Sequence, residues 1–447
     1  MVGRSRNIYG RRLWWLLAAT ILWAGSVQPP QAQAQEEAPV MTLEQSILIA
    51  LERNLDVQVA REEIAAAREQ KHEATTGFLP KMKAEYSYTR PSETTINFMG
   101  NTIRTQDKNQ YRFTGGVEQP IFTGFSILSN YQLAKLGLDV AEIQLERSRL
   151  DIILQVKEAY FGILSAQKIQ EVAEQAVQQL QAQLEVAENF YQVGMSPKID
   201  VLDAEVRLAE AQQELIRAAN DVRLAKARFN TILRQPVDQD VKVIDILSEK
   251  PYEKSYAACV QLSLEQRPEL VEAEKNVARA EKQITLAKSD YYPSVALTAD
   301  LVRQGDDLTV SGSTYSDREK WNVAAVATWT FFEWGKTRYA VNRQRARLRQ
   351  AKKTREQLED AVRLETKTAY LNLEAAEANV RVAKKSVESA EENFRISKER
   401  YREQVATATE VLDAQTRLTQ ARTNYTNALV DFNVAQARLI RAMGLEG

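Results

Sequence analysis

Acidic residues at two matching places are the side chains of this sequence whose type and spacing could do chemistry. Asp200 and Asp203 are three residues apart, and Glu410 and Asp413 repeat that spacing, so each pair shares one face of a helix. A cluster of carboxylates at a narrow passage favours cations. Acidic residues also stabilise a helix N-terminus through the backbone dipole, so both interpretations stay open.

Enzymatic chemistry has few residues to use. One histidine, His72, and one cysteine, Cys259, leave no imidazole cluster for a metal or an acid–base pair, and no internal disulfide. We expect His72 to be solvent-exposed and Cys259 to be a small packing residue. The sequence also has no glycine-rich phosphate loop and no nucleophile elbow. It therefore predicts a protein that is not an enzyme and needs no cofactor or metal.

The elements that position the carboxylates occur twice. Residues Leu51–Pro80 match Leu264–Pro293 at a constant offset of 213, and Pro120–Ile232 match the stretch ending at Ala442 at an offset of 210. This unit is far longer than a solenoid repeat, so we expect two copies of one large supersecondary unit. The expected divisions are a first repeat at 35–235, a linker at 236–256 and a second repeat at 257–447.

Long stretches without proline predict very long helices. Residues 124–193 and their copy at 335–403 are rich in strong helix formers, and about 70 residues at ~1.5 Å each reach ~105 Å. Each is expected to turn into a second helix, at 198–233 and at 407–443. Those returning helices carry apolar residues in alternating steps of three and four, with alanine on one side of most heptads, which predicts antiparallel coiled-coil hairpins.

Strand periodicity replaces helix periodicity within each repeat. Apolar and polar residues alternate at about 81–122, around a polar loop at 90–110, and again at about 294–332. Trp321 and Trp329 share the apolar face of the second hairpin and would lie ~26 Å apart on a strand at ~3.3 Å per residue. That spacing fits the aromatic girdles of an outer-membrane barrel. A soluble hairpin packed on a core is the alternative.

Four strands per chain cannot close a barrel around a lumen, so the chain must assemble with copies of itself to span a membrane. Two copies would give eight strands with an interior filled by side chains, whereas three would give twelve and room for a pore. The expected fold class is an α+β membrane protein. Its helical hairpins would extend the barrel as a tube into the periplasm.

The N-terminus predicts export across the inner membrane. Four arginines precede an apolar run at 13–25 that is too short to span a bilayer, and Ala32-Gln33-Ala34 follows as a cleavage site. We interpret residues 1–34 as a signal peptide, with a membrane anchor as the alternative. Loss of four arginines and no acids changes the formal charge from −1 to −5, which does not favour nucleic acid as a partner.

The chain resembles the TolC-like outer membrane efflux proteins, or outer membrane factors, over nearly all of its mature length. The motifs that carry the resemblance are Gln119–Gly124, Phe331–Gly335, Tyr191–Gly194 with Asp200–Ala204, and Tyr401 with Glu410–Ala414. The resemblance implies a homotrimer in contact with outer membrane lipid, with a twelve-stranded barrel and an α-helical tunnel. It also implies a periplasmic adaptor and an inner-membrane transporter as partners.

The same resemblance implies roles for the residues near the helical turns. Acidic residues at the positions of Glu410 and Asp413 line the pore constriction, and a tyrosine matching Tyr401 helps to hold it shut; Asp200 and Asp203 belong to the same periplasmic tip. The residues expected to form the tip turn and to dock the adaptor are Gly194, Ser196, Pro197, Val201, Leu202, Val411 and Leu412. Two positions depart from the family pattern: Gln404 stands where a glycine is frequent, and Ala406 where some members have a gate arginine.

Local helix capping is the alternative explanation for these tip residues. Ser196 followed by Pro197 is expected to cap the returning helix of the first repeat, with the proline in its first turn. Thr407 and Glu410 fit a capping box in the second repeat, and Gly194 could supply a left-handed turn.

Together with these patterns, the resemblance implies a passive exit duct of a tripartite efflux or type I secretion system in the outer membrane, with a large periplasmic part. A transporter in the inner membrane would supply the energy, so drug efflux and protein secretion stay open alternatives. A periplasmic coiled-coil spacer or tether is the competing hypothesis.

Overall fold

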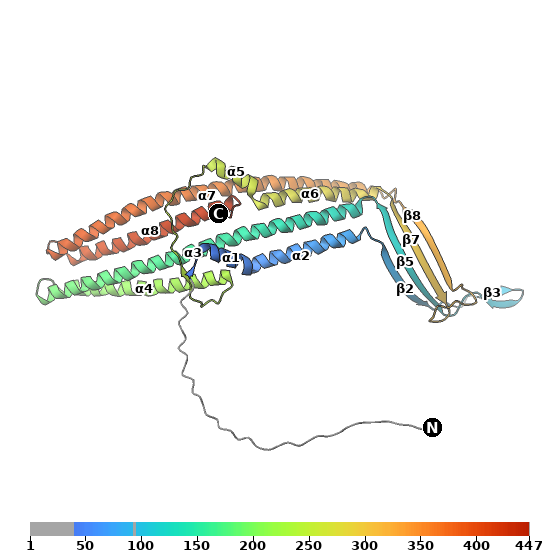
Figure 1. Ribbon diagram of the computed structural model, residues 1–447, viewed down its shortest axis with the longest axis horizontal. Coiled ribbons are helices and arrows are strands. Elements are labelled where there is room, and N and C mark those ends of the chain that lie inside the picture. The colour runs from blue at the N-terminus through green and yellow to red at the C-terminus, as the bar shows by residue number, and fades with distance from the viewer. Residues whose placement is uncertain (1–39, 93–94, 447) are drawn as a thin grey trace, which may run out of the picture. The chain divides into compact units, whose positions relative to one another are not determined.

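The computed structural model describes residues 40–92 and 95–446. The expected signal peptide, residues 1–34, lies outside the described residues. Figure 1 shows long helices that lead at one end into a β-sheet and turn back on themselves at the other.

The two repeats contain the same series of large elements. The first repeat comprises α1 (Leu43–Arg53), α2 (Leu55–Thr76), β2 (Lys81–Thr89), β5 (Gln110–Thr123), α3 (Ser126–Gln192) and α4 (Lys198–Leu233). The second comprises α5 (Tyr256–Gln266), α6 (Pro268–Lys288), the 3₁₀ turn η1 (Ser289–Tyr291), β7 (Ser294–Gly305), β8 (Glu319–Thr328), α7 (Lys336–Arg402) and α8 (Ala408–Ala442). The returning helices α4 and α8 pack along α3 and α7 as the heptad pattern predicts.

The main sheet is antiparallel in the order β2-β5-β7-β8, so β5 and β7 join the two repeats. Its register aligns the apolar faces predicted for the two hairpins: one row across the strands is Ala84, Gly115, Leu301 and Trp321. The adjacent row, which projects to the other face because side chains alternate, is Lys83, Gly116, Asp300 and Asn322. The sheet therefore has one largely apolar face and one polar face.

The expected loop at 90–110 contains a second, smaller hairpin, so its assignment as loop was wrong. Strands β3 (Thr95–Phe98) and β4 (Asn101–Arg104) pair antiparallel. Met99 and Gly100 connect them with φ values of 49° and 79°. Positive φ at both central residues is the geometry of the tight turns that suit the twist of a hairpin. The short strands in a polar setting gave no clear alternation in the sequence.

The last strand ends earlier than its alternation predicted. β8 stops at Thr328, so Trp329 lies just beyond the strand rather than within it. Thr328 pairs with Ser294, the first residue of β7, and Pro293 before it has no N–H with which to continue the ladder. The end of the sheet is thus determined by the partner strand.

Helix α3 lies at the centre of the helical part of the chain. It packs against α2 and α4 of its own repeat and against α6 and α8 of the second. The Tyr160 hydroxyl of α3 is 3.1 Å from the Met41 carbonyl oxygen and accepts a hydrogen bond from the Ile244 N–H at 2.9 Å. It thereby ties α3 to β1 (Val40–Met41) and to β6 (Lys242–Val243), which pair in parallel.

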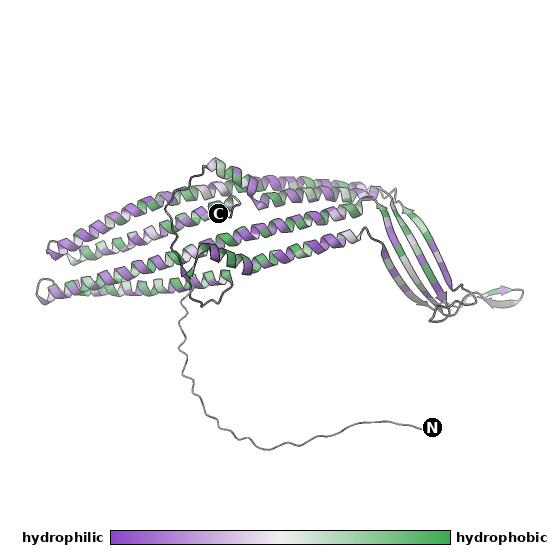
Figure 2. Cartoon of the chain, in the orientation of Figure 1, coloured by the Kyte–Doolittle hydropathy of each residue, from purple (hydrophilic) through white to green (hydrophobic). Residues whose placement is uncertain are grey.

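Two expectations for single residues are confirmed: His72 is exposed, and Cys259 is buried in the hydrophobic cluster around Leu373 and Phe432. Polar and apolar residues alternate along the helices (Figure 2). Among the described residues, no helix combines the length and the apolar character needed to cross a membrane.

Candidate functional site

Two tight turns, between α3 and α4 and between α7 and α8, form the tip that carries the predicted site. Both turns have a residue in the left-handed region, Gly194 at φ 72° and Gln404 at φ 62°. Each closes with the same backbone hydrogen bond, from Met195 N–H to the Phe190 carbonyl at 2.8 Å and from Val405 N–H to the Arg400 carbonyl at 2.9 Å. The two repeats therefore make one turn geometry with different residues.

Helix α8 begins with the capping box that the sequence predicted. The Glu410 N–H donates to Thr407 Oγ1 at 3.3 Å, and the Thr407 N–H donates to Glu410 Oε1 at 3.4 Å. The Glu410 carboxylate also lies 3.9 Å from the Arg400 guanidinium. Glu410 thus has a local structural role in the single chain.

The cap expected at Ser196 is wrong. The N-cap of α4 is Pro197, which has no capping side chain, and the buried Ser196 hydroxyl has no hydrogen-bond partner within the described residues. Pro197 matches Thr407 at the offset of 210. Because the two turns have the same length, the cap position falls on the proline instead of on the serine before it.

Tyr401 is the most deeply packed of the residues predicted to form the constriction. It is 4% exposed, its ring lies 5.5 Å from that of Phe190, and it clusters with Ala408 and Val411. Burial, followed by the nearby charge of Asp200, raises the pKa of the Tyr401 hydroxyl. The matching Tyr191 is 46% exposed, so the two repeats differ at this position.

The four carboxylates remain on two helices in the single chain. Asp200 is partly buried on α4, and its pKa is raised by burial and then by Asp203. Asp203, Glu410 and Asp413 are exposed. Asp413 lies 4.0 Å from the Arg207 guanidinium of α4, which connects the two tips.

Sequence reasoning missed Arg207, Arg400 and Phe190 as parts of this site. Arg207 carried a usable signal, because it follows Asp203 by four residues and recurs as Arg417 after Asp413. The packing of Phe190 on Tyr401 joins α3 to α7 and had no counterpart in the sequence pattern.

Three of the seven residues expected to form the tip turn and dock an adaptor are buried within the chain: Val201, Val411 and Leu412. Val201 and Leu412 pack in one hydrophobic cluster of α3, α4 and α8, and Val411 packs beside Tyr401. Leu202, the counterpart of Leu412, is 43% exposed, whereas Leu412 is 3% exposed. Of these four residues, Leu202 is the one available for a contact with another molecule.

The two predicted girdle tryptophans are both exposed. Trp321 lies on the apolar face of β8. Trp329 follows the strand, and its indole N–H donates to the Tyr291 carbonyl at 3.3 Å. Three further exposed aromatic residues after the strand were not in the predicted site: Phe331, Phe332 and Trp334.

Within the described residues, no group of three or more His, Cys, Asp or Glu side chains is arranged to hold a metal ion. The exposed carboxylates and the exposed apolar side chains of the tip can present charge and packing surfaces to a passing or docking molecule.

Comparison with known proteins finds a family model described as "Outer membrane efflux protein", which matches residues 47–233 and 259–445. Each matched segment spans most of one repeat.

Two curated relatives cover most of the chain at low identity. The outer membrane efflux protein BepC of Brucella suis is 23% identical over 81% of this chain and 75% of its own. The alkaline protease secretion protein AprF of Pseudomonas aeruginosa is 24% identical over 74% and 68%. The outer membrane protein TolC of Escherichia coli is 28% identical over 45% of this chain and 42% of its own.

Solved structures share the fold. The CmeC outer membrane channel of Campylobacter jejuni superposes with a TM-score of 0.76 at 20% identity, covering 90% of this chain and 85% of that chain. The outer membrane protein VceC of Vibrio cholerae gives a TM-score of 0.76 at 19% identity, covering 90% and 96%.

Proposed function

Because the chain belongs to the outer membrane efflux protein family and is an outer membrane channel for efflux or secretion, we propose that three copies form its complete duct. In this proposal the duct receives substrates from a periplasmic adaptor and an inner-membrane transporter and conducts them passively to the exterior. The observation that carries the proposal is the four-stranded sheet with one apolar and one polar face.

That sheet supports closure by identical copies. Its edge strands β2 and β8 are unpaired among the described residues, and an unpaired edge is a template for another strand. Pairing β8 of one copy with β2 of the next gives twelve strands around a lumen when three copies meet. The apolar face would then contact lipid and the polar face would line the passage.

The tip supports a constriction in the same assembly. Three-fold symmetry would repeat the exposed carboxylates of Glu410 and Asp413 around one axis, and a ring of negative charge favours cations. Tyr401, packed on Phe190 beside Asp200, would hold the two hairpins of each chain together. Glu410 would then have two roles: it would contribute to cation selectivity and it would cap α8.

The tip of the first repeat supports adaptor docking. Apolar side chains there are exposed around the α3–α4 turn, whereas the second-repeat turn exposes Val405. The exposed set of the first repeat is Val193, Met195, Ile199, Leu202 and Val206. Exposed apolar residues gathered at one place mark interaction sites.

The protein would have no chemistry of its own. Its family is one of channel proteins, and the proposed duct takes its energy from the inner-membrane transporter. The choice of cargo would then lie with that transporter, for drug efflux and for protein secretion alike.

Single-channel recording in a planar bilayer tests the duct and its constriction. The mature protein should give small, cation-selective steps, and the double variant Glu410→Ala/Asp413→Ala should give larger steps or lose selectivity. Glu374→Ala is the matched control, because Glu374 is exposed on α7 far along the helix from the turn. Failure of the wild-type protein to insert would favour the periplasmic spacer, and unchanged selectivity in the double variant would exclude the carboxylate ring.

A further inference from the structure

We propose that neighbouring subunits are joined by a charge-reversed copy of an ion pair that joins the two repeats within each chain. In this interface, called the subunit seam, Glu62 on α2 of one subunit pairs with Arg349 on α7 of the next. The inference rests on the proposed trimer and adds the contacts that select which helices meet in it.

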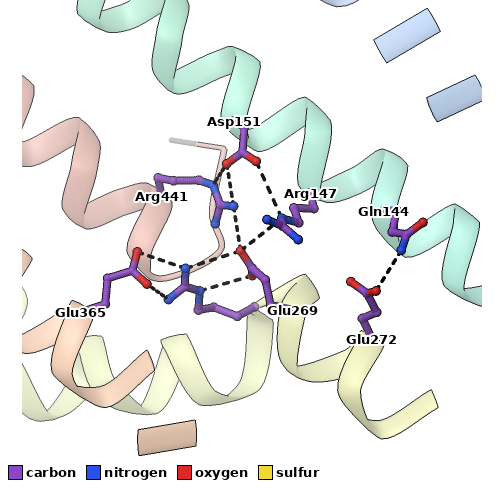
Figure 3. Close-up of polar contacts among 8 residues, drawn as sticks. Gln144, Arg147, Asp151, Glu269, Glu272, Glu365 and Arg441 are labelled. Atoms are coloured by element: carbon purple, nitrogen blue, oxygen red, sulfur yellow. Dashed lines mark hydrogen bonds and ion pairs between the residues drawn. The ribbon is translucent and has the colours of Figure 1, made fainter. Parts of the chain in front are cut away.

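The template is the contact between α3 and α6, called the internal seam. Lys275 Nζ lies 2.8 Å from Asp139 Oδ2. Farther along, the Gln144 side-chain amide donates to Glu272 Oε1 at 2.9 Å, and α3 continues into the ionic cluster shown in Figure 3. Helices from different repeats are thus matched by polar contacts along the internal seam.

Because the chain is duplicated, each residue of the internal seam has a counterpart in the other repeat. The counterpart surface on α7 has no partner helix within the chain's described residues. Asp139 corresponds to Arg349 at the offset of 210, and Lys275 corresponds to Glu62 at the offset of 213. Helix α3 has α2 on one flank and α6 on the other, whereas α7 has α6 on one flank and no equivalent neighbour on the other among the described residues. The missing neighbour would be α2 of another copy.

Exposure of matching residues supports this assignment. Ser129 and Phe161 of α3 are buried, whereas their counterparts on α7, Tyr339 and Leu371, are exposed. These counterparts lie on the flank of α7 that a copy of α2 and the helices after it would cover. An apolar or aromatic side chain at such a position gains from burial.

The charges on the two helices are complementary. The first twenty residues of α7, 336–355, contain nine lysines and arginines and no acid, whereas the matching stretch of α3, 126–145, contains one lysine and two acids. Arg345 and Arg349, four residues apart on one face of α7, are exposed and form no ion pair within the described residues. Helix α2 offers exposed acids that likewise lack an ion pair there: Glu62, Glu63, Glu69 and Glu73.

The reversed order of charges in the two ion pairs also disfavours incorrect pairings of helices between subunits. If α2 of another copy replaced α6 beside α3, Glu62 would face Asp139. If α6 of another copy docked on the free flank of α7, Lys275 would face Arg349. Both arrangements place like charges together, which disfavours them. First and second repeats must therefore alternate around the assembly.

Charge-reversal variants of the full-length protein in detergent test the subunit seam. Glu62→Arg and Arg349→Glu should each lower the recovery of trimer in native mass spectrometry by roughly tenfold, because the like charges recur at every seam. The double variant Glu62→Arg/Arg349→Glu should restore it. Arg68→Glu and Arg347→Glu are matched controls on the same two helices: both residues are exposed and form no ion pair within the described residues. Arg68 lies six residues from Glu62, and Arg347 lines the groove beside α6 of its own chain, away from Arg349.

A cross-linking experiment checks the geometry independently of stability. Glu62→Cys/Arg349→Cys should give covalent trimers with a short bismaleimide, while Glu62→Cys/Arg347→Cys should not, because Arg347 lines the groove beside α6 of its own chain. Cys259 is buried and stays unlabelled. A wild-type protein that is not a trimer would overturn the proposed assembly. A wild-type trimer that tolerates both single reversals and does not cross-link would overturn the charge-coded seam and leave the duct intact.

Discussion

At the scale of the residue, matching positions in the two repeats differ in burial and in helix capping. Tyr401 is packed on Phe190 while Tyr191 is exposed. The cap position is occupied by Thr407 in one repeat and by Pro197 in the other. At the turns, the second repeat is packed and capped, whereas the first exposes apolar side chains. We propose that the two halves of the tip serve closure and docking separately.

The left-handed residues of the two turns provide a matched pair of substitutions. Gln404→Gly should stabilise the folded protein by ~1 kcal/mol, because a side chain at φ 62° is strained where glycine is not. Gly194→Ala should destabilise it by a similar amount, since Gly194 has φ 72° and open space around it. Denaturant unfolding measures both. A destabilising effect of Gln404→Gly would show that the Gln404 side chain makes a contact worth more than the backbone strain.

At the scale of the element, the register of the sheet aligns the apolar and polar residues that alternate along each of its four strands, so that the sheet has one apolar and one polar face. Val117, Ala299 and Val323 stand in one row, and Glu118 and Thr298 stand in the next row on the opposite face. A shift of one residue in any strand would send its apolar side chains to the polar face. The pairing of β5 with β7 thus makes one amphipathic sheet from two repeats.

Arginine substitutions at neighbouring positions of β7 test which face meets lipid. Ala299→Arg should destabilise the membrane-inserted protein by ~2–4 kcal/mol if Ala299 lies near the bilayer midplane. Thr298→Arg, on the polar face, should have much less effect, because its side chain would project into the aqueous passage. Urea unfolding from lipid vesicles gives both values. Equal effects would contradict the assignment of the faces.

At the scale of the whole molecule, an ionic cluster holds the two repeats together. Arg441 of α8 lies 2.7 Å from Asp151 of α3 and 2.8 Å from Glu269 of α6, and Arg267 bridges Glu269 and Glu365. Figure 3 shows how these side chains converge from three of the long helices and α6. Burial alone would raise the pKa of Glu269, but its hydrogen bond to Arg441 and the charges of Arg267 and Arg441 hold that pKa below its ordinary value.

Removal of Arg441, at the centre of the cluster, tests whether a buried arginine contributes more to stability than an exposed one. Arg441→Ala should cost ~3 kcal/mol, because it removes the buried Arg441 and leaves the partly buried Glu269 with Arg267 but without its partner on α8. Arg438→Ala, one turn away, should cost at most ~1 kcal/mol, because the exposed Arg438 pairs with Glu158 at the surface. Denaturant unfolding compares the two variants, and equal losses would contradict the importance of burial.

The same cluster predicts a pH dependence. Since the pKa of Glu269 is lower in the folded state than in the unfolded state, its contribution to stability is present above the unfolded value and is lost as pH falls through the folded one. The wild-type protein should therefore lose stability on acidification more steeply than Arg441→Ala does, which the same unfolding measurements at a series of pH values will show.

The sequence by itself determined the elements of this protein and their repetition. Stretches of strong helix formers without proline predicted the bounds of α3 and α7 to within a few residues. Thr407 and Glu410 predicted the capping box of α8. Both predictions succeeded because they depend on local backbone preferences. The same local reasoning failed in two places. β8 ends at Thr328 because its partner β7 begins at Ser294. Ser196 is not the cap because α4 begins at Lys198, which makes Pro197 the N-cap.

Only the tertiary structure decided which matching residues are buried and which are left for another molecule. Leu412 and Leu202 occupy the same motif position, yet one is enclosed by the first-repeat hairpin and the other is exposed. Asp139 has Lys275 beside it, while its counterpart Arg349 has no ion-pair partner among the described residues. A repeated sequence specifies the same local fold twice, but the burial of each copy depends on the neighbour that covers it, and that neighbour is set by packing between distant parts of the chain.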